Sequence, residues 1–210
     1  MAALFRDRAD AGRSLAQTLE HVDLGDAVVV GLARGGVAVA AEVASALALP
    51  LDALAVRKVG YPRQPEYGIG AVAPGSGGVY VRTSEDLDDE QLRSVVERAT
   101  EEAQELDAVL HSAHPRLSLD GKTAVLVDDG LATGATMVAA VRWSRARGAR
   151  RAVVAVPVGA FETAELLRGE ADGVVCLYEQ QRFGAVGFWY AAFDQLTDED
   201  VIALLAASRG

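Results

Sequence analysis

The sequence predicts an α/β fold with a mainly parallel sheet of about five strands flanked by helices. Five short runs dominated by Val, Leu and Ala have the length and apolar character of strands that are buried on both faces. Helical patterns separate several of these runs. Strand and helix therefore alternate, as they do when helices cover both faces of a parallel sheet.

The individual elements follow from local signals. The predicted strands are 27–32, 51–57, 123–128, 152–158 and 173–177. The predicted shorter helices are 37–48, 135–147 and 161–168, of which the last two close at a glycine. A longer amphipathic helix is predicted over 88–111, where Asp88 and Gln91 form a plausible N-terminal cap. Residues 58–79 are rich in proline and glycine, so we expect a long irregular loop that acts as a lid.

Composition limits the class of protein. The 210 residues carry a formal net charge of −10, which argues against a nucleic-acid-binding surface. No run is apolar enough to span a membrane, and the charged N-terminus does not resemble a secretory signal, so we expect a cytoplasmic protein. The only cysteine, Cys176, excludes an internal disulfide and a thiolate zinc site.

Charged and glycine-rich segments follow three of the predicted strands. Ala33, Arg34, Gly35 and Gly36 come after the first strand. Arg57 and Lys58 end the second, and Asp128 and Asp129 end the third. Because ligands bind at the carboxyl ends of parallel strands, we expect these three segments to converge.

The segment VLVDDGLATG, residues 125–134, holds the strongest chemical signal. Its glycines and threonine lead into a predicted helix at Ala135, whose free N–H groups would hold a phosphate. The two aspartates can accept hydrogen bonds from sugar hydroxyls and bind a divalent cation. Glycine spacing and the missing lysine exclude a nucleotide P-loop and a dinucleotide-binding turn. Phosphate, diol and metal together indicate a phosphorylated ribose.

The stretch VLVDDGLATGATM closely resembles the donor-binding motif of the type I phosphoribosyltransferases, which use 5-phosphoribosyl-1-pyrophosphate. VVVGLARGG is similar to the pyrophosphate loop of that family, and VRKVGYPRQPEYG to the flexible-loop region of its adenine-type members. The resemblance covers nearly the whole chain. It implies one domain over 1–210, with a core of about 20–177, a flexible loop over 58–79, and a hood of about 178–196 joined by the N-terminal segment.

The resemblance assigns roles to residues. It implies that Asp128 and Asp129 bind the ribose hydroxyls and assist Mg²⁺, with Asp129 among the catalytic residues. The phosphate loop would comprise Gly130, Leu131, Ala132, Thr133, Gly134, Ala135 and Thr136. Pyrophosphate would be held by Ala33, Arg34, Gly35, Gly36, Arg57 and Lys58. The family also implies a non-proline cis peptide at Ala33–Arg34 and a homodimer.

The residues that would bind the nucleobase match the family less completely than the residues that would bind the donor. The C-terminal FGAVGFWYAAFDQL resembles the hood of 6-oxopurine enzymes, so Phe188, Trp189 or Tyr190 would stack on the base. The chain departs from those enzymes at Ala132, where they carry an aspartate, and in 153–159, which lacks their base-reading lysine. Glu66 is the one acid or base candidate. A purine is the favoured acceptor.

Other interpretations remain open. A regulator of the same fold could bind the donor or a nucleotide without catalysis. The aromatic residues 188–190 are equally compatible with a core or dimer contact, and a solvated surface role is the stronger alternative for Glu66. His111 and His114 lack a third metal ligand, and the arginines within 142–151 fit a solvated helix end.

Overall fold

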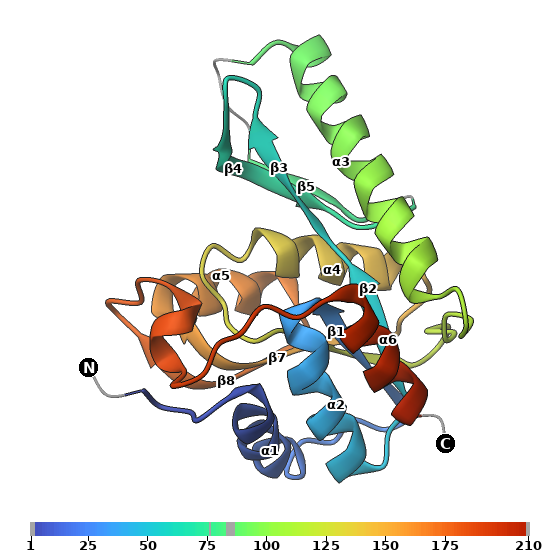
Figure 1. The fold of residues 1–210 in the computed structure, drawn as a ribbon, viewed down its shortest axis with the longest axis vertical. Helices are drawn as coiled ribbons and strands as arrows, with labels where there is room; N and C mark the ends of the chain where they lie inside the picture. Colours follow the sequence, from blue (N-terminus) through green and yellow to red (C-terminus); the bar gives the residue numbers. More distant parts are fainter. Residues whose placement is uncertain (1–2, 76, 83–86, 209–210) are drawn as a thin grey trace.

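The larger layer of the molecule is a five-stranded parallel sheet in the order β2-β1-β6-β7-β8 (Figure 1). The structure, a computed structural model, describes residues 3–75, 77–82 and 87–208. The strands are β1 (Ala27–Ala33), β2 (Leu51–Ala55), β6 (Thr123–Val127), β7 (Arg151–Ala160) and β8 (Gly173–Gln180). The predicted fold class is confirmed, because these strands are the five apolar runs of the sequence.

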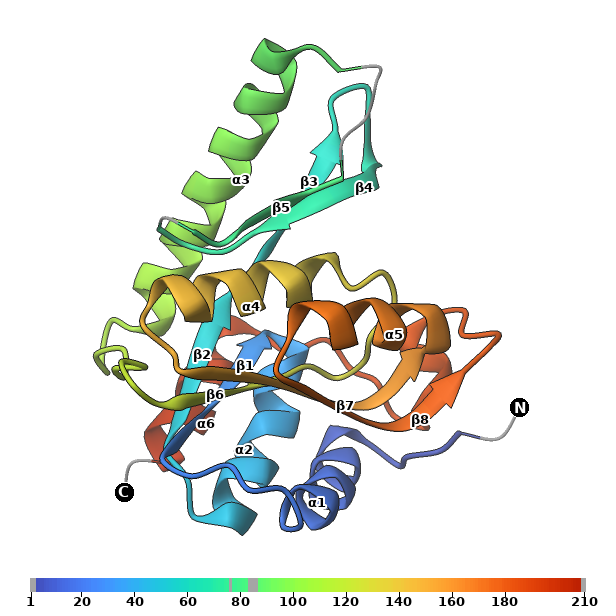
Figure 2. The same ribbon diagram turned by 180° about the vertical axis from the view of Figure 1, so that it is seen from behind.

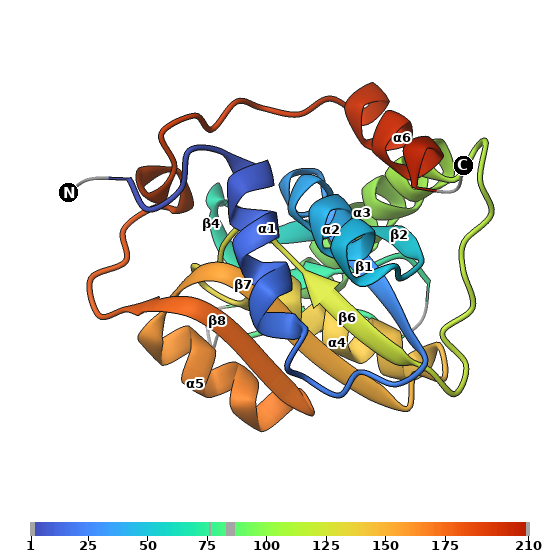
Figure 3. The same cartoon turned by 90° about the horizontal axis from the view of Figure 1, so that it is seen from below.

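Helices cover both faces of this sheet (Figures 2 and 3). On one face the core brings side chains of α1 (Arg8–Leu19), α2 (Gly35–Leu47) and α6 (Asp198–Ala207) against alternate strand residues such as Val29 and Val125. On the other face α4 (Ala135–Ala146) and α5 (Phe161–Glu170) pack on the intervening residues, such as Val30 and Leu126. Both faces of each central strand are therefore removed from water, which explains the absence of polar alternation in the sequence.

Two helices were not predicted from the sequence, although both begin at a recognisable cap. The side chain of Asp7 accepts a hydrogen bond from the Asp10 N–H at 2.7 Å and starts α1. Thr197 and Asp200 form a reciprocal capping box at the start of α6. None of the described helices is long and apolar enough to cross a membrane.

The segment 58–79, predicted to be an irregular lid, instead forms most of a second sheet, so that prediction was wrong about its secondary structure. The antiparallel order is β3 (Arg57–Tyr61), β4 (Gln64–Val72) and β5 (Val79–Val81). Glycines interrupt the apolar alternation of these strands in the sequence. Pairing between strands and packing against α3 (Asp89–Leu110) supply the order that local propensity does not.

The second sheet and α3 project from the main body beyond α4 (Figures 1 and 2). Their shared core includes Val59 and Ile69 of the sheet and Ala99 and Ala103 of the helix. The predicted second strand, 51–57, is divided at Val56 because β2 belongs to the parallel sheet and Arg57 already opens β3. The two sheets therefore meet directly beside the carboxyl end of β2.

Candidate functional site

The acidic doublet lies at the carboxyl end of β6, directly against the start of α2. A Cβ atom at Gly36 would lie 2.6 Å from the Val127 carbonyl oxygen and 2.8 Å from the Asp128 Cα. A Cβ atom at Gly35 would lie 2.1 Å from Asp129 Oδ2. Only glycine fits at either position, so the glycine pair brings the loop after β1 and the loop after β6 together, as predicted. The Ala33–Arg34 peptide bond is cis.

Burial destabilises the charged forms of both carboxyl groups of the doublet. Burial raises the pKa of Asp128 well above its usual range, and the neighbouring charge of Asp129 raises it further. Burial also raises the pKa of Asp129, while the Arg8 guanidinium opposes that rise. Arg8 and Lys58 both act to lower the pKa of Asp128. A cationic or metal-bound ligand would therefore be stabilised at this position.

Arg8, which the sequence analysis did not identify, is the cation in contact with the doublet. Its Nε donates a hydrogen bond to Asp129 Oδ2 at 2.8 Å, and the two side chains are only 12% and 14% exposed. Arg8 lies in the first turn of α1, more than a hundred residues from the doublet in the sequence. No local motif surrounds it, so only the tertiary structure could reveal the contact.

The loop that follows the doublet is anchored at Leu131 and Ala132, and the N–H groups beyond Leu131 remain exposed to a ligand. Leu131 is fixed by a bond from its N–H to the Val158 carbonyl at 2.9 Å, and Thr163 Oγ1 donates to the Ala132 carbonyl at 2.7 Å. Gly134 caps α4 with φ of 75°. Within the described part of the chain, the N–H groups of 132–137 have no protein hydrogen-bond partner. This helix start therefore has free donors of the kind that bind an anion, and phosphate binding there stays a prediction.

The predicted pyrophosphate-binding cations lie at the same edge but have different surroundings. Arg34 is exposed at the start of α2, and its Nη1 lies 3.5 Å from Asp198 Oδ1 of α6. Lys58 is exposed, and its charge reaches Asp128. Arg57 lines a separate hollow with Asp198 and α3, of about 250 Å³. Of these three predicted cations, Arg34 and Lys58 are therefore the two best placed to bind an anion beside the glycine pair and the doublet.

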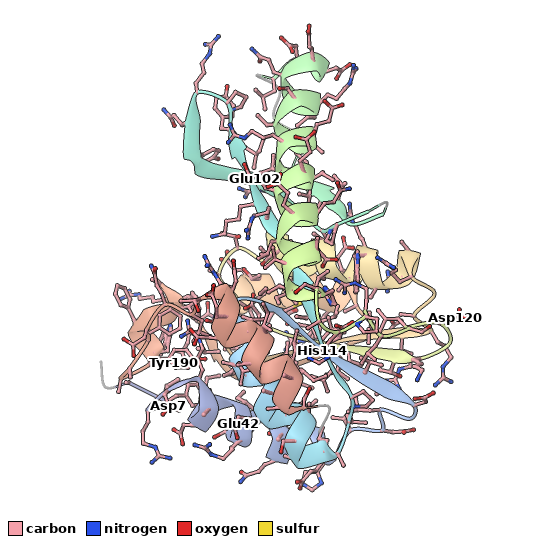
Figure 4. The ribbon with its side chains drawn as sticks, turned by 45° about the vertical axis from the view of Figure 1, so that its right-hand side comes forward. Asp7, Glu42, Glu102, His114, Asp120 and Tyr190 are labelled. Atoms are coloured by element: carbon pink, nitrogen blue, oxygen red, sulfur yellow. The ribbon has the colours of Figure 1, made fainter. Side chains whose placement is uncertain are left out.

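The C-terminal segment packs against the backbone of the doublet and of the residue that follows it. Tyr190 is buried, and its hydroxyl donates a hydrogen bond to the Asp129 carbonyl oxygen at 2.6 Å. Tyr190 lies near the beginning of α1, where Figure 4 also labels Asp7. Val186 fills the space that a side chain at Gly130 would need. Two residues of the hood thus contact the backbone of the segment that carries the doublet.

The three aromatic residues predicted to stack on a base have different environments. Phe188 is 68% exposed, whereas Trp189 is 3% exposed, stacks on Phe183 and donates its Nε1–H to the Phe183 carbonyl. Trp189 and Tyr190 are core residues here, so neither presents an open ring face. Phe188 is the aromatic residue of the three that a ligand can reach. The side chain of Glu66 lies outside the described residues.

Comparison with known proteins identifies the family. The model of the phosphoribosyl transferase domain matches residues 5–188. The chain belongs to the phosphoribosyl transferase family. Two Mycobacterium tuberculosis proteins with the provisional name phosphoribosyl transferase are each 44% identical to it over 207 residues, covering 96% of this chain and 46% of theirs. The chain thus spans about half the length of these curated relatives.

Solved structures agree with this family fold. The crystal structure of TT1426 from Thermus thermophilus is 42% identical, has a TM-score of 0.84, and covers 98% of this chain and 99% of that one. The structure of AQ2163 from Aquifex aeolicus shares only 14% identity, with a TM-score of 0.53 over 88% of this chain and 85% of that one. The first likeness extends over nearly the whole chain.

The residues present are compatible with Mg²⁺. Magnesium is usually held by one or two carboxylates together with water and the phosphate oxygens of a substrate, rather than by a complete protein cage. Asp128 and Asp129 match this donor set. No cluster of three or more metal-binding side chains occurs among the described residues, so a metal here would need ligand oxygens as well.

Proposed function

We propose that this phosphoribosyl transferase domain transfers 5-phosphoribose from Mg²⁺-bound 5-phosphoribosyl-1-pyrophosphate to a nucleobase, with a purine as the favoured acceptor. One observation carries the proposal: the acidic doublet and the unpaired N–H groups of 132–137 lie in the same segment of the chain. The doublet also packs so closely against Gly35 and Gly36 that no side chain would fit at either glycine. This arrangement offers a hydroxyl or metal site that is followed directly in the chain by an anion site.

The reaction breaks the bond between the anomeric carbon and the pyrophosphate oxygen and forms a bond from that carbon to a base nitrogen. Positive charge develops on the ribose ring as pyrophosphate leaves with the electron pair. Arg34 and Lys58 would bind the departing pyrophosphate, and the N–H groups at the start of α4 would hold the 5-phosphate. Asp128 and Asp129 would bind the ribose hydroxyls and Mg²⁺, which supplies positive charge to the leaving group.

The acceptor side rests on fewer residues. Phe188 would stack on the base, since its ring is exposed. Glu66 remains the candidate for removing the proton that the base loses. The second sheet, which carries Lys58 and Glu66, would cover the ligand and exclude water during the reaction.

The direct test is release of pyrophosphate from the donor in the presence of Mg²⁺ and a panel of purine and pyrimidine bases. Base-dependent release supports the transferase. Tight donor binding without turnover on any base supports instead a regulator that uses the fold for sensing. A wild-type chain that binds no donor overturns the proposal.

A pair of substitutions tests the role of the doublet. Asp128→Asn together with Asp129→Asn should weaken donor binding about a hundredfold, because both charges that face the ribose and metal are lost. Asp26→Asn is the matched control, since Asp26 is 71% exposed and pairs loosely with Lys122 at the opposite end of the sheet. Donor affinity that is equal in all three proteins would refute the assigned role.

A further inference from the structure

Arg8 connects the acidic doublet with two segments that are distant in the sequence. Its Nε donates to Asp129 Oδ2, and its Nη1 donates to the Asp194 carbonyl oxygen at 2.7 Å. Its guanidinium also lies 3.9 Å from the centre of the Phe193 ring. These contacts use two in-plane N–H groups and one face of the planar group, so they fix the orientation of the guanidinium.

The glycine pair of the predicted pyrophosphate loop is shaped to this ion pair. A Cβ atom at Gly35 would lie 2.1 Å from Asp129 Oδ2 and 3.0 Å from Arg8 Nε. The carboxylate and the guanidinium therefore occupy the volume that any side chain at Gly35 would fill. The loop after β1, the loop after β6 and the first turn of α1 meet at this one contact.

Backbone pairing keeps α1 in position for this contact. The N–H groups of Ala191 and Ala192 donate to the carbonyl oxygens of Phe5 and Arg6, both at 2.8 Å. Tyr190 reaches across from the same segment to the Asp129 carbonyl. The N-terminal segment and the hood thus hold both the side chain and the backbone of Asp129.

The hydrogen bond from Arg8 Nε occupies only one of the two carboxylate oxygens of Asp129. Arg8 engages Oδ2 of Asp129, and no other residue in the described part of the chain donates a hydrogen bond to Asp129 Oδ1. A mostly buried carboxylate with one fixed oxygen has a single orientation, so its second oxygen has a defined direction. Preorganised acceptors of this kind bind a sugar hydroxyl or a hydrated cation without a further ordering cost.

On these grounds we infer that Arg8 is a positioning residue of the donor site, which holds Asp129 in the orientation that receives the ribose hydroxyls and the metal-bound donor. This inference rests on the proposed function. Arg8 acts through Asp129 and does not itself contact the donor. The N-terminal helix and the hood are thereby part of the donor site rather than a separate cover.

The test is calorimetric binding of 5-phosphoribosyl-1-pyrophosphate with Mg²⁺ to wild type, Arg8→Gln, Arg8→Lys and the control Arg6→Gln. Arg6 is a suitable control because its side chain is 77% exposed and forms only a surface pair with Asp10. We expect Arg8→Gln to weaken binding by at least about tenfold and Arg6→Gln to change it less than about twofold. Arg8→Lys should restore part of the loss, because it retains the charge but not the fork of donors.

A double-substitution cycle separates positioning from a general structural role. In an Asp129→Asn background, Arg8→Gln should cause little further loss of affinity, because the contact that it removes is already broken. An undiminished loss in that background would show that Arg8 acts only on folding, and would overturn the inference. The folded fraction of each variant is checked by circular dichroism, and Arg8→Lys replaces Arg8→Gln in the cycle if the latter does not fold.

The remaining outcomes are also decisive. Unchanged donor affinity in Arg8→Gln overturns the inference while leaving the proposed function intact. Tighter binding in Arg8→Gln also overturns it, because Arg8 would then compete with the ligand for Asp129. A wild-type chain that binds no donor overturns the proposed function and this inference together.

Discussion

Replacement of Gly35 by alanine tests the geometry of the donor site with a single methyl group. The new Cβ atom would lie 2.1 Å from Asp129 Oδ2 and 2.9 Å from its Cγ. An ordinary contact begins at 3.4 Å, so the carboxylate oxygen must retreat by about 1.3 Å. Such a retreat misplaces the group that faces the ribose and strains its 2.8 Å bond to Arg8.

The expected cost follows from this displacement. Overpacking at a well-packed position typically costs about 1–3 kcal/mol, so we expect the free energy of unfolding to fall by about 2 kcal/mol. In urea this corresponds to a midpoint roughly 1 M lower. A displacement of about 1 Å in a positioning group can reduce the rate of a reaction about a hundredfold. We therefore expect the free energies of donor binding and of activation to change by more than the free energy of unfolding.

Urea unfolding and calorimetric donor binding measure the two effects separately. Gly169→Ala is the matched control, because a Cβ atom there meets nothing within 4 Å and the residue lies in α5. That substitution should stabilise the protein by about 0.5–1 kcal/mol and leave donor binding unchanged. If Gly35→Ala behaves like Gly169→Ala in both assays, the close approach of Gly35 to Asp129 is not a feature of the protein in solution.

Three other results are expected. Asp198→Asn should tighten binding of inorganic pyrophosphate about two- to fivefold by calorimetry, because it releases Arg34 from a half-exposed pair; unchanged affinity would show that the pair does not compete. Burial raises the pKa of Cys176 to about 12, so its alkylation by iodoacetamide at pH 8 should be about a thousandfold slower than that of a free thiol and should recover in urea; rapid reaction of the folded protein would contradict this. Arg116→Met removes a cationic partner of the buried Asp52 and should lower the free energy of unfolding by about 3 kcal/mol without affecting donor binding, and equal stability in urea would be evidence against the pair.

Much of the main sheet could be predicted because its signal is local. Val28 and Leu126 belong to apolar runs that are short and bounded by turns, and this pattern identifies strands buried on both faces. The long helix was also predicted closely, since 88–111 became α3 from Asp89 to Leu110 with Asp88 as its cap. The apolar residues that define each pattern are also the residues that pack in the core, so their burial agrees with the pattern.

The second sheet could not be predicted in the same way. In β4, Gly68 and Gly70 weaken the apolar alternation that identifies a strand, so the segment has the composition of a loop. Its pairing depends on β3, on β5 and on the apolar face of α3, which is supplied by a later part of the chain. Such non-local stabilisation leaves little trace in a short window of sequence.

The sequence by itself determined the family, the five buried strands and the donor motif, because each depends on neighbouring residues whose spacing is visible in one dimension. Only the tertiary structure decided that Arg8 pairs with Asp129, that Asp198 faces Arg34, and that Trp189 is buried while Phe188 is exposed. Those contacts join segments brought together by the packing of the N-terminal helix, the hood and the final helix. The two members of such a charge pair come close together only in the folded chain, and no local sequence pattern encodes the pair.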